Sequence, residues 1–402
     1  MRYSNKLILL TLSTIALILV VESHRTIPSE EEKEEMEKLL NYLNKPAGKS
    51  FQTEHGYILD CIDIQKQLAF DHPLLKNHSI KLKPTIIPKW TKDNNTSHKS
   101  NSLPFRQDGI SCPVGTVIVK RIILEDLIQA QRLKSLGFNY PRQISSKDDK
   151  KIDLTGHHFA TISYKDYHYG AKGNINVWNP NVSPDQFSLA AMTVSGDEGF
   201  QSISAGWIVY PGLYHNNQSR LFTYWTADGN NKTHCYNTLC PGFVHVSTKY
   251  AIGMLVQPVS IYDGQQYQLE VSIYQQDHVT GDWWFVLNNE PIGYWPKSLF
   301  KPQGLADGAS AVFWGGEVYS SVKEKSPSMG SGHFPQEGYK KAAYVNGLKI
   351  ITDITKEISS PLASALKTVA DSPNCYNVKK ILGVGEYWSR AILFGGPGGC
   401  TF

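Results

Sequence analysis

The stretch "QYQLEVSIYQQ", residues 266–276, decides the fold class. Apolar side chains occupy every second position from Tyr267 to Ile273, and polar side chains stand between them. Alternation with a period of two is typical of a β-strand that buries one face. The same alternation of apolar and polar residues, interrupted by Gly, Asn and Pro, recurs in "HHFATISY", "KGNINVWNPNV", "QSISAGWIVYP", "RLFTYWTAD", "GFVHVS", "DWWFVLNNEPIGYWP" and "SAVFWGGEVYSS".

These many short strands predict an all-β domain over residues 151–402. Periodicity alone fits a barrel as well as a sandwich. A chain of this size without repeats favours two packed sheets, so we expect a β-sandwich of two antiparallel sheets. Of the 402 residues, 41% are hydrophobic and 19% are charged, which is typical of a globular protein with a core.

Residues 24–150 combine a helical pattern with two strand-like runs, which predicts a small α+β pro-segment. Its first part, residues 27–46, reads as a short helix with a capping box at Ser29 and Glu32 and an apolar stripe from Met36 to Leu43. Two strand-like runs follow, near residues 57–64 and 117–123, with a polar, Pro-containing loop between them. A charged connector lies around residue 150, and exposed connectors of this kind are preferred sites of proteolytic cleavage.

The first 23 residues predict a secretory signal peptide. Basic residues come first, an apolar run extends from Leu7 to Val21, and the small residue Ser23 stands where signal peptidase cuts. The run is short for a bilayer span, and the later sequence contains no stretch that is long and apolar enough. We expect a secreted protein without a membrane anchor after signal cleavage.

The six cysteines agree with export, because an even number fits an oxidising compartment. Spacing alone leaves the pairing open, but proximity in sequence favours Cys61–Cys112, Cys235–Cys240 and Cys375–Cys400. A zinc site in "HCYNTLC" would need His234 beside both cysteines and His245 as a fourth ligand, which is a weak metal signal. We therefore expect no metal and no cofactor.

Possible glycan sites fit the same compartment. The N-x-S/T sequence occurs at Asn77, Asn94, Asn95, Asn181, Asn217 and Asn231. The net charge is only +4 and is not gathered into a basic arm, so nucleic acid is not an expected partner.

One carboxylate stands out in "AVFWGGEVYSS", residues 311–321. Glu317 lies among aromatic residues, valines and glycines, and no positive charge occurs within five residues on either side. A buried, ionised carboxylate without a partner is costly, so such a group tends to raise its pKa and become neutral. This context makes Glu317 a candidate acid–base group, and a strand-end residue bonded to backbone amides is the structural alternative.

A set of longer stretches, rich in Trp, Gly and Cys, runs along the whole chain. They are "DCIDIQKQLAFDHPLLKNHSI", "NVWNPNV", "AGWIVYPGLY", "RLFTYWTADG", "CYNTLCPGFVHVS", "DGQQYQLEVSI", "DWWFVLNNEPIGYWPKSLF", "WGGEVYS" and "MGSGHFPQEGYKKAAYVNGLKI". Together they resemble the plant neprosin family of secreted proteins. The resemblance implies a neprosin-type activation pro-segment at residues 24–150 and a neprosin-type peptidase domain at residues 151–402.

The resemblance further implies a glutamic peptidase, made as a zymogen, that cuts beside proline at acidic pH. The family uses two glutamates on strands that face one cleft, one in Glu-Ala-Gly-Trp and one in Trp-Gly-Gly-Glu. One carboxylate acts as general base and the other, kept protonated, donates to or polarises the scissile carbonyl. Its partners would be proline-containing peptides or proteins and the chain's own pro-segment.

Glu317 matches the second of these positions, but Ser204 stands where the first glutamate belongs. A serine hydroxyl is neither an acid nor a base near neutral pH unless another group activates it, and no histidine occurs in that motif. Glu198, six residues earlier, would lie about 20 Å away on a continuous strand and could substitute only if a loop folds back.

Other candidates are weaker. Aromatic rings could offer flat faces to a proline ring in the cleft, although alternation favours the core for most of them; they are Trp207, Tyr210, Trp225 and Trp314, with Trp283 and Trp295 as further candidates. Ser331 and His333 in "MGSGHFPQEG" are not in a nucleophile motif and have no orienting acid in the sequence pattern.

Three functions from different classes therefore stay open. They are an active secreted glutamic endopeptidase, a pseudopeptidase that binds Pro-rich extracellular or cell-wall proteins, and a structural protein of the extracellular space. The residue at position 204 separates the first from the others. We expect little proline-directed cleavage by the natural chain at acidic pH, and more after Ser204→Glu.

Overall fold

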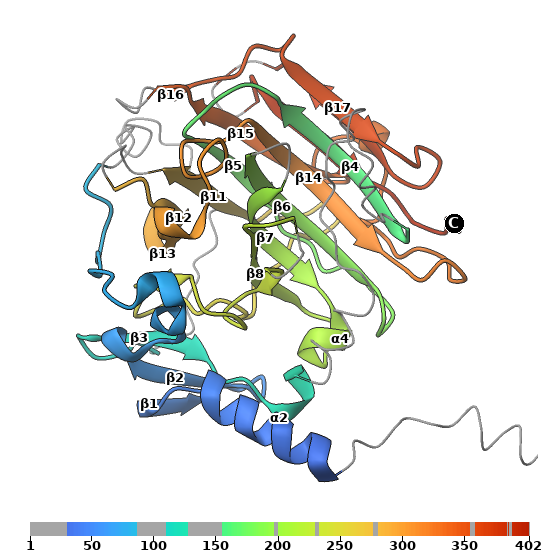
Figure 1. Cartoon of the computed structure of the whole chain (residues 1–402). Coiled ribbons are helices and arrows are strands. Elements are labelled where there is room, and N and C mark those ends of the chain that lie inside the picture. The colour runs from blue at the N-terminus through green and yellow to red at the C-terminus, as the bar shows by residue number, and fades with distance from the viewer. Residues whose placement is uncertain are drawn as a thin grey trace, which may run out of the picture. The chain divides into compact units, whose positions relative to one another are not determined.

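The computed structural model describes residues 30–86, 110–127, 155–196, 200–229, 233–275, 280–353, 358–383, 385 and 388–401 (Figure 1). Contacts group the chain into two compact units, residues 1–42 and residues 43–402, which are described separately. The predicted signal peptide, the candidate acid Glu198 and the sites Asn94, Asn95 and Asn231 lie outside the described residues. Among the described helices, none combines the length and the apolar composition that a bilayer crossing requires.

The predicted N-terminal helix is confirmed as α2, Glu30–Leu43. Its apolar residues recur at the helical spacing that the sequence predicted, from Met36 to Leu43. On its exposed side Lys38 forms an ion pair with Glu34 at 3.1 Å, one helical turn away. Such a pair adds only a few tenths of a kcal/mol to a helix, so the apolar stripe is the stronger determinant.

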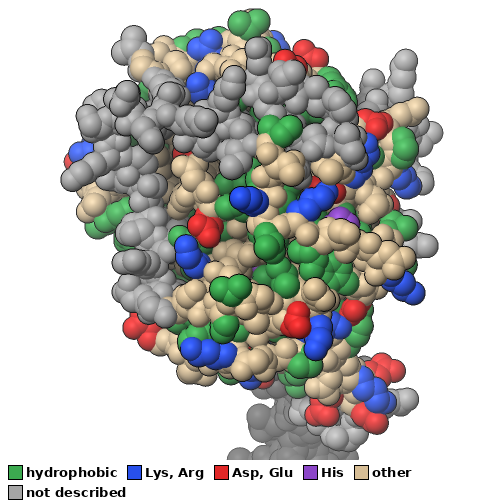
Figure 2. Space-filling view, turned by 90° about the vertical axis from the view of Figure 1, so that its left-hand side faces the viewer, with side chains coloured by type: hydrophobic (Ala, Val, Ile, Leu, Met, Phe, Trp, Pro, Cys, Tyr) green, Lys and Arg blue, Asp and Glu red, His purple; other side chains and the backbone are tan. Residues whose placement is uncertain are grey.

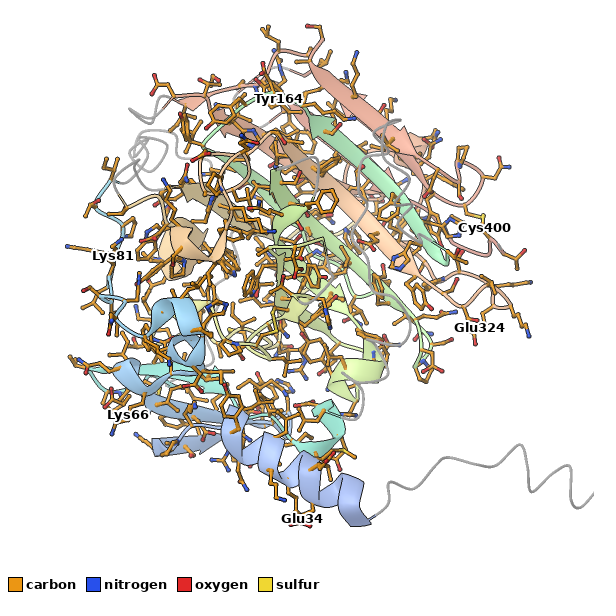
Figure 3. The ribbon with its side chains drawn as sticks, viewed as in Figure 1. Glu34, Lys66, Lys81, Tyr164, Glu324 and Cys400 are labelled. Atoms are coloured by element: carbon orange, nitrogen blue, oxygen red, sulfur yellow. A yellow bond between two sulfur atoms is a disulfide. The ribbon has the colours of Figure 1, made fainter. Side chains whose placement is uncertain are left out.

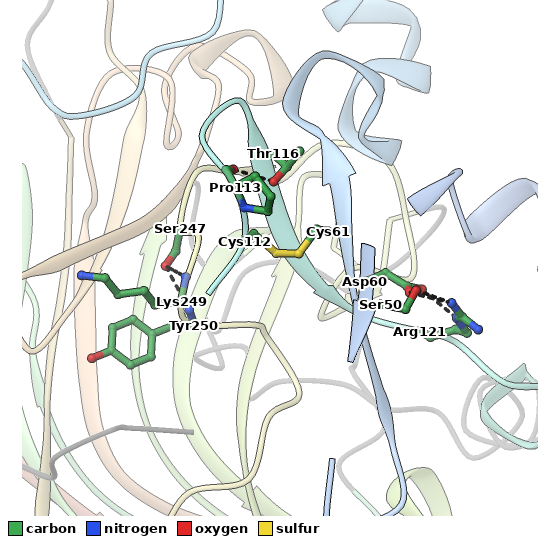
Figure 4. The surroundings of a disulfide bond; sticks show 10 residues. All are labelled: Ser50, Asp60, Cys61, Cys112, Pro113, Thr116, Arg121, Ser247, Lys249 and Tyr250. Carbon is green, nitrogen blue, oxygen red and sulfur yellow. Dashed lines mark hydrogen bonds and ion pairs between the residues drawn. A yellow bond between two sulfur atoms is a disulfide. The ribbon is translucent and has the colours of Figure 1, made fainter. Parts of the chain in front are cut away.

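Residues 47–120 contribute a small antiparallel sheet of β1 (Ala47–Gln52), β2 (Ile58–Asp63) and β3 (Thr116–Lys120), in that order. β2 and β3 are the two strands that the sequence predicted here. A disulfide joins Cys61 on β2 to Cys112 just before β3 (Figure 4). Arg121 donates from Nε and Nη2 to the two carboxylate oxygens of Asp60, at 2.7 Å and 2.6 Å, and this two-point contact holds the end of β3 against β2.

The first of two larger sheets has nine antiparallel strands, β10-β13-β12-β11-β5-β15-β19-β18, with β16 also paired to β15. The strands are β5 (Gly170–Asn176), β10 (Val244–His245), β11 (Gln268–Gln275), β12 (Trp283–Leu287), β13 (Glu290–Trp295), β15 (Ala343–Ile351), β16 (Ile358–Ser359), β18 (Asn377–Ile381) and β19 (Ala391–Gly395). Residues 266–276, from which the fold class was predicted, contain β11, which lies between β5 and β12.

The second large sheet has seven antiparallel strands in the order β17-β4-β14-β6-β7-β8-β9. They are β4 (His157–Tyr164), β6 (Phe187–Gly196), β7 (Gln201–Val209), β8 (Ser219–Thr226), β9 (Cys235–Tyr236), β14 (Ala311–Tyr319) and β17 (Leu366–Ala370). A short helix, α4 (Pro211–Tyr214), follows β7, within the part of the chain that the sequence analysis predicted to be all-β.

The two large sheets pack face to face around one hydrophobic core (Figures 1 and 3). Trp207 on β7 donates from its indole nitrogen to the carbonyl of Asn176 on β5 at 2.9 Å, which links the two layers directly. Trp314 on β14 packs against Gly173 on β5, where a Cβ atom would lie 3.0 Å from the indole ring. The predicted β-sandwich of two antiparallel sheets is confirmed.

The disulfides are those that sequence proximity favoured: Cys61–Cys112, Cys235–Cys240 and Cys375–Cys400. Because both sulfur atoms of "HCYNTLC" are in a disulfide, neither is a thiolate that could bind zinc, and the zinc alternative is wrong. On the face drawn in Figure 2, basic and acidic side chains are interspersed among polar and apolar ones.

Candidate functional site

Glu317 lies on β14 directly after two glycines whose missing side chains let the neighbouring chain come close. Gly315 has a φ of +146°, and a Cβ atom there would lie 2.3 Å from the carbonyl oxygen of Ala160 on β4. At Gly316 a Cβ atom would lie 2.7 Å from the sulfur of Met329, on the opposite side of the sheet. The Trp-Gly-Gly-Glu stretch therefore needs its glycines for tight packing of β14 against β4 and the core.

The strand register places Glu317 on the outer face of the seven-stranded sheet, the face that points away from the inter-sheet core. It pairs with Phe159 on β4 and with Leu189 on β6, and residues paired directly across strands share a face. Leu189 belongs to a second apolar cluster, separate from the core between the sheets. Glu317 therefore lies outside the core between the two sheets.

His157, the first residue of β4, is the direct partner of Glu317. Its Nδ1 atom lies 2.8 Å from Oε1 of Glu317, and each residue is only 2% exposed. The imidazole packs between the rings of Tyr319, 4.8 Å away, and Phe159, 6.2 Å away. Nδ1 donates to the carboxylate when Glu317 is ionised and accepts from the carboxylic acid when Glu317 is protonated, so the contact serves both states.

Burial raises the pKa of Glu317 above its ordinary value. The hydrogen bond with His157 opposes this shift, and the negative charge of Asp371 adds to it. A carboxyl group of this kind exchanges its proton closer to neutral pH than an exposed glutamate does, which is the property expected of an acid–base catalyst.

Asp371 is a second carboxylate of this region that the sequence analysis missed. It follows β17, and both of its oxygens accept a hydrogen bond from the backbone N–H of Phe159, at 3.1 Å and 3.0 Å. Phe159 in turn pairs with Glu317 across β4 and β14. Because Asp371 and Glu317 are far apart in sequence and are linked only through strand β4, no local motif could have indicated that Asp371 belongs to this region.

Ser204 lies on the same outer face as Glu317 but does not touch it. It pairs with Thr193 on β6, which pairs with Phe313 on β14, four residues before Glu317. Two strand spacings and four residues correspond to about 16 Å between the Cα atoms of Ser204 and Glu317. The Ser204 hydroxyl is buried and lies 2.8 Å from the hydroxyl of Thr193.

The same separation indicates how far apart two carboxyl groups would lie if both positions held a glutamate. If both side chains reached inward, about 7 Å would separate their carboxyl groups, which in other hydrolases leaves room for a water molecule between two carboxyls. The two positions can therefore flank one substrate bond, although they cannot share a proton directly.

Most of the aromatic residues expected to line the cleft lie in the core instead. Trp207, Trp225 and Trp314 are buried among the residues between the two sheets, because they alternate with the outer-face residues of their strands. For these three the predicted cleft position is wrong. Tyr210 is the exception, since it lies with Leu189 and Phe187 in the outer-face cluster.

The Ser331–His333 stretch has an orienting acid after all. His333 Nδ1 lies 2.8 Å from Glu337 Oε1, and the hydroxyl of Tyr262 donates to the other oxygen of Glu337 at 2.8 Å. Ser331 Oγ accepts from the backbone N–H of His333 at 3.2 Å. The serine thus stabilises a Gly-rich turn, and the histidine and glutamate form a half-exposed pair beside Tyr262.

The described glycan acceptors differ in accessibility. Asn77 and Asn181 are exposed, whereas Asn217 is half-buried and donates from Nδ2 to the carbonyl of Val182 at 3.2 Å. The third residue of the Asn217 sequence, Ser219, is buried and donates to the carbonyl of Trp178. Asn77 and Asn181 are therefore the better-placed acceptors among the described ones.

Comparison with known proteins places the chain in a family. The model named Neprosin matches residues 184–397, and the model named Neprosin activation peptide matches residues 50–163. Similar solved structures include scytalido-glutamic peptidase with a peptide-based transition-state analogue (TM-score 0.29, 6% identity) and SCP-B, of the eqolisin family, with the tripeptide Ala-Ile-His (TM-score 0.26, 9% identity). Each likeness covers 60% of this chain and 98% of the other. The chain thus carries both the activation peptide and the main domain of the Neprosin family, and it belongs to that family.

Proposed function

We propose that this chain is a secreted zymogen of a glutamic endopeptidase that cuts beside proline at acidic pH. The observation that carries the proposal is a buried carboxyl group on the outer sheet face, Glu317, held at 2.8 Å by a buried histidine. Glu317 occupies the matching position in the Trp-Gly-Gly-Glu stretch, and membership in the Neprosin family with its activation peptide agrees with this role.

The chemistry follows from the groups on this face. Ionised Glu317 takes a proton from a water molecule, the resulting hydroxide attacks the scissile carbonyl carbon, and Glu317 then gives the proton to the leaving nitrogen. His157 acts as a positioning residue, because its Nδ1 fixes the carboxyl group and supports its ionised state. The Ser204 and Thr193 hydroxyls lie across the face, where a hydroxyl can donate to the developing oxyanion.

A hydroxyl is a weaker substitute for the carboxylic acid that the family places at position 204. Loss of one oxyanion donor typically costs about 10²–10³ in kcat, so we propose a slow enzyme. The alternative is a pseudopeptidase that binds Pro-rich extracellular or cell-wall proteins without cutting them. The contact between Ser204 and Thr193 favours this alternative, because each hydroxyl already has a partner.

The position of β4 limits where an activating cut can fall. β4 lies between β17 and β14 and carries His157, so a cut after this strand would remove it from the middle of the sheet. We place the cut before His157, in the charged connector around residue 150. The activation-peptide match extends to residue 163, past this point. The three disulfides agree with secretion, and the apoplast, cell wall and vacuole are the proposed locations.

The test is cleavage of a peptide with a single proline from pH 3 to 7 by the secreted chain after acid treatment. Glu317→Gln should abolish the activity, while the matched variant Glu290→Gln, on β13 of the other sheet, should retain it. Activity that survives in Glu317→Gln would refute the assignment. A folded natural chain without activity across this range would support the pseudopeptidase.

A further inference from the structure

The outer face of the seven-stranded sheet holds a buried guanidinium group that the proposed chemistry does not use. Arg220, on β8, is 2% exposed. Its guanidinium carbon lies 4.7 Å from the ring centre of Tyr57 and 5.6 Å from that of Tyr214. Asn237 donates to the Tyr214 hydroxyl at 2.7 Å and fixes the orientation of that ring. Arg220 is thus held between two aromatic rings, a geometry that suits guanidinium groups.

Arg220 is incompletely satisfied where it lies. Among the described residues, Nε and Nη1 of Arg220 have no hydrogen-bond partner. Burial lowers the pKa of Arg220, and Tyr57, Tyr214 and Asp126 oppose that shift. The carboxylate of Asp126 is itself bound by Lys120 at 2.8 Å and by His215 at 3.4 Å. A buried cation with free N–H donors is costly, so Arg220 is prepared for an anion that can accept two hydrogen bonds.

Part of what surrounds Arg220 comes from the activation peptide. Tyr57 and Asp126 both lie within residues 50–163, the activation-peptide match, and both precede the connector in which we place the cut. Tyr214 belongs to α4, in the main domain. When the pro-segment leaves, Arg220 loses one ring and one nearby carboxylate, and its side chain becomes accessible beside Tyr214.

Arg220 is also aligned with the proposed catalytic group. The register runs without a shift from Glu317 to Leu189, from Leu189 to Ile208, and from Ile208 to Arg220. Paired residues share a face, so these four side chains form one row across the sheet. Three strand spacings put the Cα atoms of Glu317 and Arg220 about 14 Å apart, which an extended peptide spans with about four residues. The two residues between them, Leu189 and Ile208, are apolar and are buried in the outer-face cluster of the zymogen.

We propose that Arg220 is a carboxylate-binding subsite that selects peptides with an acidic group about four residues from the cleaved bond. The inference rests on the proposed function of Glu317. The peptide would cross the strands over Leu189 and Ile208, with its carboxylate accepting from Nε and Nη1 of Arg220. The carboxylate can belong to an Asp or Glu side chain or to the C-terminus of a short peptide, and Tyr57 covers the subsite in the zymogen.

The experiment uses the acid-treated full chain and end-blocked peptides with a single proline. One Asp is moved through the second to sixth positions on either side of the cleaved bond, and each peptide is compared with its Asn counterpart. A further peptide carries a free C-terminal carboxylate in place of the Asp. We expect kcat/KM to favour the acidic peptide about tenfold at one distance near four residues, the order of one charge-assisted bidentate contact. Arg220→Gln should bring the ratio of acidic to neutral peptide close to one.

Arg390→Gln is the matched control, because this residue lies outside the row and donates from Nε to the carbonyl of Pro361 at 2.6 Å, so the ratio should stay at the natural value. If Arg220→Gln is not secreted, the Asp-to-Asn series with the natural chain still decides, since it needs no variant. If no peptide is cut, the proposed peptidase function fails, and fluorescence anisotropy of the same labelled peptides tests the subsite alone. Equal kcat/KM, or equal binding, for acidic and neutral peptides at every position would overturn the proposal.

Discussion

Replacing Glu317 by Gln should stabilise the folded chain at neutral pH, and the gain should shrink as the pH falls. Because burial raises the pKa of Glu317 above 4.5, the folded protein keeps a proton above pH 4.5 that the unfolded chain has lost. The unfolded state then binds fewer protons, so this one group lowers the free energy of unfolding by up to about 1.4 kcal/mol per pH unit as the pH rises from 4.5 to the folded-state pKa. The Gln amide does not titrate and can keep the hydrogen bond to His157.

The assay is the thermal midpoint of the full chain before acid treatment, measured at pH 4, 5, 6 and 7 for the natural chain and the variant. The difference in midpoint should be smallest at pH 4 and grow by about 2 °C per pH unit within the titration window. Taking the difference removes the titration of all other groups. Glu290, which is part-exposed and 3.7 Å from Lys249, supplies Glu290→Gln as the matched variant that removes a carboxyl group outside the buried site. Parallel curves for Glu317→Gln would refute the argument that burial holds a proton on this group.

Three further outcomes follow from the described contacts. His157→Asn should keep a partner for Glu317 but reduce kcat/KM by about 10² and displace its acid limb, measured as a pH profile of peptide cleavage; an unchanged profile would remove His157 from the site. Ser204→Glu should raise cleavage at acidic pH while lowering the free energy of unfolding by about 3 kcal/mol, because the position is buried; a variant that is stable yet no faster would contradict the placement of a second acid here. Burial lowers the pKa of His245 to about 4, so between pH 6.5 and 4 the unfolded state binds a proton that the folded state does not, and the free energy of unfolding falls as the pH falls. His245→Gln should reduce the slope of the free energy of unfolding against pH by about 1.4 kcal/mol per pH unit, measured by urea unfolding. An unaltered slope would count against this assignment.

Much of the fold was readable from the sequence, because the information is local. The alternation in β11, β8 and β14 follows from one buried face per strand, and the N-terminal helix follows from its apolar stripe. Strand order was not predictable, since it depends on pairings such as β5 with β15, between residues far apart in the chain. The prediction that cysteines close together in the sequence form the disulfides is confirmed, because each bridge closes a comparatively short loop.

The candidate site was readable only in part. Glu317 could be identified from an unusual carboxylate in an apolar strand, but His157 and Asp371 reach it through β4 and β17 and leave no trace near it in the sequence. The predicted cleft position of three aromatic residues was wrong for a different reason, which is the alternation of faces along a strand. Trp207, Trp225 and Trp314 stand three, five and three positions from Ser204, Arg220 and Glu317 on their own strands. Residues an odd number of positions apart on a strand point to opposite faces, so these rings lie in the core.

The arrangement of the disulfides has a consequence for activation. One bridge closes within residues 61–112 and the other two within residues 235–240 and 375–400, so none of the three crosses the connector around residue 150. A single cut there would leave two pieces held together only by non-covalent contacts. Before the cut, the linker keeps the pro-segment at an effective concentration near the millimolar range; after it, the pro-segment is a free ligand that dissociates on dilution. The pro-segment would then act as an ordinary dissociable inhibitor, whose grip depends on protein concentration and which could be added back in trans.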